Sequence, residues 1–111
     1  MAVYVSNIVI EQGFSFESTF QLEDTRTGNF LDLSGYDVKS QIRKSYYSKN
    51  YISFASSITD AELGEITIGL EPNQTILLKP GRYVYDIKLL NQSGQYKAIE
   101  GSALVRAGVT T

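Results

Sequence analysis

The chain contains no cysteine, no histidine and no tryptophan among its 111 residues. Without cysteine, the fold cannot depend on disulfides, which small secreted domains often use to support a small core. Without histidine and cysteine, the sequence lacks the general base of most serine hydrolases, the thiol nucleophile and the common zinc ligands. These absences exclude most hydrolase and zinc-protein functions, and they require a core that is stabilised by packing alone.

The chain also lacks a strong net charge and long apolar runs. Its 10 basic and 12 acidic side chains give a formal net charge of -2, so no broad positive field favours nucleic acid as a partner. Residues 1–5 show no secretory-signal pattern, and no stretch is long enough to cross a bilayer. The glycines stand singly, so no phosphate-binding loop is present. We therefore expect a protein made in a cytosol that uses no cofactor and binds neither nucleic acid nor a membrane.

Alternation of apolar and polar residues, which is typical of a strand with one buried face, recurs along the chain. It is clearest in residues 14–22, where the even positions are mostly large and apolar. Similar patterns occupy residues 36–43, 65–70 and 83–89, and shorter strands are expected near residues 3–10, 51–57 and 96–105. The sequence predicts one all-β domain over residues 1–111, an immunoglobulin-like antiparallel β-sandwich of about seven strands.

The connection before residues 83–89 favours a sandwich over a small barrel. In immunoglobulin-like domains a helical turn leads into a corner, where a tyrosine hydrogen-bonds back to the preceding backbone two residues before the second cysteine. Residues 72–77 can form that turn with Asn73 as its cap. Tyr83 is then the structural corner tyrosine, and Tyr85 fills the cysteine position in the core. The alternative is that Tyr83 is only a large inward-facing residue.

Two further positions carry predictions about the strands. Ser40 is the only polar residue expected on the inner face of residues 36–43. Gly101 interrupts the pattern of the last strand, and a glycine there indicates either a β-bulge or a close approach of another backbone segment.

Twelve carboxylates remain as candidate chemistry. A glycosidase needs two of them across a cleft, and Asp32, Asp37 and Asp86 lie in or beside predicted strands. Glu23 and Asp24, with Asp32 nearby, would offer oxygen ligands to calcium, but their spacing matches no calcium-loop motif. Solvated strand and turn carboxylates are the simpler interpretation of both groups, so we expect no catalytic residue and no metal site.

Residues 43–51 are the most suggestive segment, with three basic residues and three tyrosines in one short connection. Tyrosines at a strand end can anchor a protein interface or stack on sugars. We therefore select Arg43, Tyr46, Tyr47 and Tyr51 as candidate interface residues. The alternative is that one or two of these tyrosines continue the core and the rest form a solvated loop.

Several segments together resemble the small immunoglobulin-like virion proteins of tailed phages, including cyanophages, and the N-terminal domain of phage baseplate upper proteins. The matching segments are residues 10–13 with Phe16 and Phe20, residues 31–36 with 41–43, and residues 64–68, 78–87 and 101–105. The likeness covers most of the chain. Its motifs are mainly combinations of turn and strand that other sandwiches of this topology share.

The resemblance implies a non-enzymatic accessory protein of the virion, located on a tail, baseplate or capsid. Its implied partners are other virion proteins or further copies of the chain. Baseplate upper proteins continue into a receptor-carrying region, so receptor attachment is not expected here. An edge strand near residues 3–10 could extend a neighbouring sheet. The competing hypotheses are a carbohydrate-binding module that uses Tyr46, Tyr47 and Tyr51, and, with less support, a glycosidase that uses Asp32 and Asp86.

Overall fold

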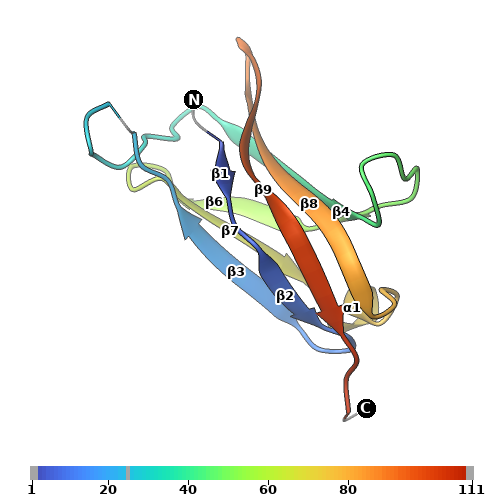
Figure 1. Cartoon of the computed structure of the whole chain (residues 1–111). Coiled ribbons are helices and arrows are strands. Elements are labelled where there is room, and N and C mark those ends of the chain that lie inside the picture. The colour runs from blue at the N-terminus through green and yellow to red at the C-terminus, as the bar shows by residue number, and fades with distance from the viewer. Residues whose placement is uncertain (1–2, 25, 110–111) are drawn as a thin grey trace.

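The computed structural model describes residues 3–24 and 26–109, and it folds this part of the chain into two packed β-sheets (Figure 1). Within these residues there are nine strands and one short helix. They are β1 (Tyr4–Val5), β2 (Ile8–Glu11), β3 (Phe16–Gln21), β4 (Asp37–Arg43), β5 (Ile52–Ser53), β6 (Ala55–Asp60), β7 (Glu65–Leu70), α1 (Pro72–Thr75), β8 (Gly81–Asn91) and β9 (Gly94–Arg106). No helix in the described part of the chain is long and apolar enough to span a membrane.

The larger sheet has the strand order β1-β9-β8-β4-β5, and β2 also pairs with β9. The smaller sheet has the order β3-β7-β6. This is an immunoglobulin-like sandwich, so the predicted all-β class is confirmed. Two details differ from the expectation. The N-terminal strand is divided into β1 and β2, both of which run parallel to β9. The single strand expected near residues 51–57 is also divided, into β5 at the edge of the larger sheet and β6 in the smaller sheet.

The core lies between the sheets and consists of alternate residues from their facing sides. Ile66, Ile68 and Leu70 of β7 face Tyr85, Ile87 and Leu89 of β8, and all six side chains are buried. Phe54 joins the sheets, because its ring lies 6.0 Å from that of Phe16 and 6.1 Å from that of Tyr85. This packing follows directly from the period-two patterns of the sequence.

The predicted corner contains the expected hydrogen bond. The Tyr83 hydroxyl donates to the Lys79 carbonyl oxygen at 2.8 Å, and Tyr85 is buried in the core two residues later. The cap assignment was wrong: Glu71 caps the helix, and its N–H donates to the Gln74 side-chain oxygen at 2.9 Å. Proline suits the first helical position, so the helix begins at Pro72, earlier than a cap at Asn73 would allow.

Gly101 marks a close backbone approach. A Cβ atom at this position would overlap the Ser6 carbonyl oxygen and lie 2.8 Å from the Ser6 carbonyl carbon. The bulge alternative is wrong for Gly101, which pairs in register with Tyr85; the register instead shifts at Ala98.

The link between β1 and β2 is held against β9 and β8 at this point. The Ser6 N–H donates to the Glu100 carbonyl at 2.9 Å, and the Asn7 side-chain oxygen accepts from the Ser102 N–H at 3.0 Å. The Tyr85 hydroxyl donates to the Ser6 carbonyl oxygen. Burial raises the pKa of the Tyr85 hydroxyl above its ordinary value.

Ser40 faces the core as predicted and is only 4% exposed, yet its hydroxyl has no hydrogen-bond partner among the described residues. A buried hydroxyl without a partner loses its hydration and gains nothing in return. We therefore expect Ser40→Ala to raise the free energy of unfolding by about 1 kcal/mol, measured by urea denaturation. A drop of similar size would show that the hydroxyl is paired in solution.

Candidate functional site

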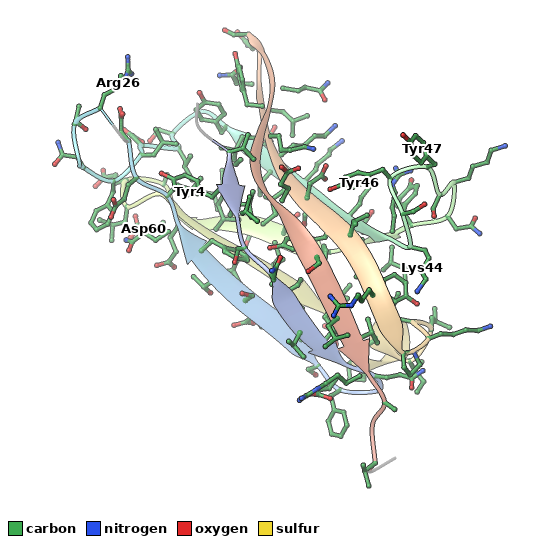
Figure 2. The ribbon with its side chains drawn as sticks, viewed as in Figure 1. Tyr4, Arg26, Lys44, Tyr46, Tyr47 and Asp60 are labelled. Carbon is green, nitrogen blue, oxygen red and sulfur yellow. The ribbon has the colours of Figure 1, made fainter. Side chains whose placement is uncertain are left out.

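The connection between β4 and β5, here called the tyrosine loop (residues 44–51), projects from the larger sheet (Figures 1 and 2). It contains a tight turn in which the Ser48 N–H donates to the Ser45 carbonyl at 3.1 Å. The Ser45 N–H donates to the Ser48 hydroxyl oxygen at 3.1 Å, and the two hydroxyls are also 3.1 Å apart. These contacts fix the backbone that carries Tyr46 and Tyr47 between the two serines.

The three tyrosines of this loop are exposed. The exposed fractions are 63% for Tyr46, 95% for Tyr47 and 51% for Tyr51, so the interpretation of these residues as core is wrong. Figure 2 shows that Tyr46 extends back over the sheet, whereas Tyr47 points away from it at the tip of the loop. The loop therefore presents large aromatic surface that folding does not use.

Arg43 braces the tyrosine loop from the end of β4. Its guanidinium donates to the Ser48 carbonyl at 2.8 Å and to the Gln41 side-chain oxygen at 2.9 Å. The same group lies 4.9 Å from the centre of the Tyr51 ring, a distance at which a cation is attracted to an aromatic face. Arg43 therefore positions two sides of the loop, a role that sequence reasoning did not assign to it.

Lys44 connects the loop to the tyrosine corner. Its ammonium donates to the Arg82 carbonyl at 3.1 Å and lies 4.7 Å from the centre of the Tyr83 ring. The loop is thus anchored both to its own strand and to the start of β8.

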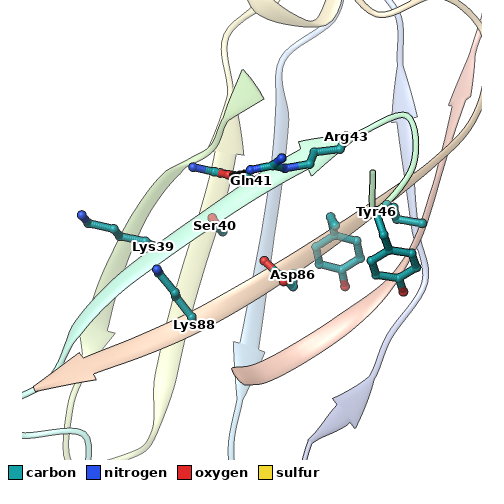
Figure 3. A pocket seen from close by; sticks show the side chains of 9 residues that line it. Lys39, Ser40, Gln41, Arg43, Tyr46, Asp86 and Lys88 are labelled. Atoms are coloured by element: carbon teal, nitrogen blue, oxygen red, sulfur yellow. Dashed lines mark hydrogen bonds between the residues drawn. The ribbon is translucent and has the colours of Figure 1, made fainter. Parts of the chain in front are cut away.

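A groove of about 400 Å³ runs along the outer face of β4 and β8 at the foot of the tyrosine loop (Figure 3). We call it the β4–β8 groove. It is lined by residues of the two strands and by Tyr46 of the loop, namely Lys39, Ser40, Gln41, Arg43, Tyr46, Val84, Tyr85, Asp86 and Lys88. The pairing register places Lys39 beside Lys88, Gln41 beside Asp86 and Arg43 beside Val84.

The groove is mainly basic, because Lys39, Arg43 and Lys88 line it together with only one carboxylate, that of Asp86, which is ion-paired with Lys97. The Lys97 ammonium of β9 lies 3.7 Å from Asp86 and 3.2 Å from Glu100. The hydrogen bond to Glu100, together with the negative charges of Glu100 and Asp86, raises the pKa of Lys97. Lys39, Arg43 and Lys88 form no ion pair with any residue in the described ranges.

Two of the carboxylates considered for catalysis or calcium binding, Asp32 and Asp24, make local hydrogen bonds. Asp32 accepts hydrogen bonds from the Ser34 hydroxyl at 2.7 Å and the Ser34 N–H at 2.9 Å, which lower its pKa. A glycosidase general acid needs the opposite shift. Asp24 accepts from the Arg26 N–H at 2.9 Å, and this bond and the arginine charge lower the pKa of Asp24. In residues 3–24 and 26–109, no three acidic side chains gather as a metal site.

The predicted edge strand near residues 3–10 does lie at a sheet edge. β1 and β2 pair with β9 on one side only. The Ser6 and Gln12 N–H groups bond to β9, so the backbone groups of Asn7 and Val9 are directed toward the open edge. That this edge accepts a further strand remains a prediction.

Comparison with known proteins supports the fold and identifies no family. No family model matches the chain, and no curated protein matches it. Among solved structures, the chain is similar to part of Listeria monocytogenes InlP, with 16% identity and a TM-score of 0.50 over 91% of this chain. It also matches part of a family 123 glycoside hydrolase from Clostridium perfringens, with 13% identity and a TM-score of 0.44 over 97% of this chain. The chain spans only 26% and 24% of these two proteins.

Proposed function

We propose that this chain is a non-enzymatic structural protein of a tailed-phage particle and that it attaches to other virion proteins through the tyrosine loop. The observation that carries the attachment site is the pair Tyr46 and Tyr47, held in the solvent by a hydrogen-bonded turn. The virion assignment is supported by the resemblance of the strand and turn segments to small phage immunoglobulin-like proteins.

The energetics of the loop suit a docking anchor. An aromatic side chain buries about 150–250 Å² at an interface, and apolar burial contributes about 25 cal/mol per Å². Much of this gain is normally offset by the ordering of mobile side chains and loops. In the tyrosine loop the backbone is already fixed by Ser45, Ser48 and Arg43. Less ordering is therefore required when a partner covers the rings.

The test replaces Tyr46 and Tyr47 and measures the number of copies of the chain in purified particles. We expect Tyr46→Ala/Tyr47→Ala to reduce its copy number per particle at least tenfold, measured by quantitative mass spectrometry of high-salt-washed virions. The melting temperature should change by less than about 2 °C, because exposed substitutions rarely alter stability by more than about 0.5 kcal/mol.

The matched control is Leu77→Ala, which removes another exposed apolar side chain (72% exposed) outside the loop. It should leave the copy number unchanged. Absence of the unmodified chain from clean particles would contradict the virion proposal, and normal incorporation of the double variant would exclude the tyrosine loop. A glycan screen covers the carbohydrate-binding hypothesis. Tight binding of a neutral oligosaccharide that depends on Tyr46 or Tyr47 would favour that function instead.

A further inference from the structure

The outer face of the larger sheet carries a row of like charges that the fold does not explain. Lys39 pairs in register with Lys88, and Lys88 pairs in register with Lys97 on the next strand. Like charges directly opposite one another on neighbouring strands destabilise a sheet. Lys97 is compensated by Asp86 and Glu100. Among the described residues, Lys88 donates to the neutral side-chain oxygen of Gln95 at 2.8 Å and forms no ion pair. Two lysines of this row therefore retain an uncompensated charge.

A second basic position lies further along the same groove. Arg43 is four residues from Lys39 on β4, which corresponds to about 13 Å along a strand. Its guanidinium uses two donors for Ser48 and Gln41, and a guanidinium has about five donors in all. The groove thus offers free cationic donors at both ends and a partly apolar wall of Val84 and Tyr46.

The middle of the groove contains no basic residue of its own, although the Arg43 guanidinium reaches the Gln41 side-chain oxygen. Gln41 and Asp86 lie side by side between the two cationic positions. Although Asp86 is paired with Lys97, its carboxylate disfavours a second carboxylate nearby. The charge pattern along the groove is therefore positive, neutral to negative, and positive.

From this pattern we propose that the β4–β8 groove binds an acidic, extended segment of a partner protein that carries two carboxylates four residues apart. In an extended peptide, residues i, i+2 and i+4 point to the same side, and residues i and i+4 are about 13 Å apart. The carboxylate at i then faces Lys39 and Lys88, and the carboxylate at i+4 faces Arg43. A neutral residue at i+2 faces Asp86. The inference rests on the proposed function only in that the partner is a virion protein.

Two peptides of identical composition test this spacing on the isolated protein. The peptide Glu-Ser-Thr-Ser-Glu has the i, i+4 spacing, and Ser-Glu-Thr-Glu-Ser has the i, i+2 spacing. Each is titrated into isotope-labelled protein at low ionic strength, and the dissociation constant is measured from NMR chemical shifts. We expect about fivefold tighter binding of the i, i+4 peptide, as exposed charge pairs allow, with shifts at β4 and β8 that weaken as salt is added.

Two double variants test whether peptide binding depends on the groove itself or only on the total positive charge of the protein. Lys39→Ala/Lys88→Ala should abolish the preference for the i, i+4 peptide, while Arg26→Ala/Lys79→Ala removes the same charge elsewhere and should preserve it. Tyr47 lies outside the groove, so the Tyr47→Ala variant should bind the peptide normally even if it fails to join particles. The two proposals can therefore fail separately. The inference would be overturned by equal affinity for both peptides or by the absence of peptide binding. It would also be overturned if the control variant lost the preference equally, or if the protein bound the acidic polysaccharide polygalacturonate but neither peptide.

Discussion

Replacing Gly101 with alanine is expected to lower the free energy of unfolding by about 3 kcal/mol, the upper end of the usual range for overpacking. The added Cβ would occupy the space of the Ser6 carbonyl group. Because the obstacle is backbone, no side-chain rotation can relieve it. The β1–β2 link must move away from β9, which breaks its bonds to Glu100 and Ser102 and the bond from Tyr85.

The measurement is urea denaturation followed by circular dichroism, with Gly28→Ala as the matched control. Gly28 has a φ of 72°, and a Cβ added to it would meet no atom within 4 Å. It therefore reports only the cost of a left-handed backbone, about 1–2 kcal/mol. If Gly101→Ala cost no more than this control, the close approach of Ser6 to β9 would be wrong.

Thr75→Val is expected to lower the free energy of unfolding by about 2 kcal/mol although it preserves the shape of the side chain. Thr75 is fully buried at the end of α1. Its hydroxyl donates to the Phe14 carbonyl at 2.8 Å and accepts from the Gly13 N–H at 3.0 Å. Valine would leave both backbone groups of the β2–β3 turn without this partner at a partly buried position.

The control for this substitution is Thr19→Val, on the exposed outer face of β3. The Thr19 hydroxyl is 3.0 Å from that of Thr67, but water can replace that contact. We expect a change within about 0.5 kcal/mol, measured under the same denaturation conditions. Equal effects of the two substitutions would show that the Thr75 hydroxyl bonds are not maintained in solution.

The longer strands were predictable because each depends on alternation within a single segment, whereas the divisions of the segments near residues 3–10 and 51–57 were not. The corner tyrosine, Tyr83, was predictable for a related reason, since its partner Lys79 is close in sequence. The first residue of the helix was harder to predict. Asn73 is a good cap by residue type, but Pro72 determines where the helix begins. The register shift at Ala98 has no comparable local signal.

The β4–β8 groove was not predictable, because it consists of residues from different strands that meet only through their register. Nothing in the sequence pairs Lys39 with Lys88 or Gln41 with Asp86. The tyrosine loop was identified from its composition, but the same composition left open whether its rings were core or surface. The Ser45–Ser48 turn decides this, since it carries Tyr46 and Tyr47 away from the core after β4 ends.

The parallel arrangement of the first and last strands has a mechanical consequence. The N-terminal and C-terminal ends of the described chain lie at opposite ends of the sandwich (Figure 1). Tension applied between them pulls β1 and β2 in one direction and β9 in the other, along the strand axes. Because β1 and β2 both run parallel to β9, this tension shears all their shared hydrogen bonds together instead of opening them in succession. The domain is therefore built to transmit a pulling force along its length before it yields.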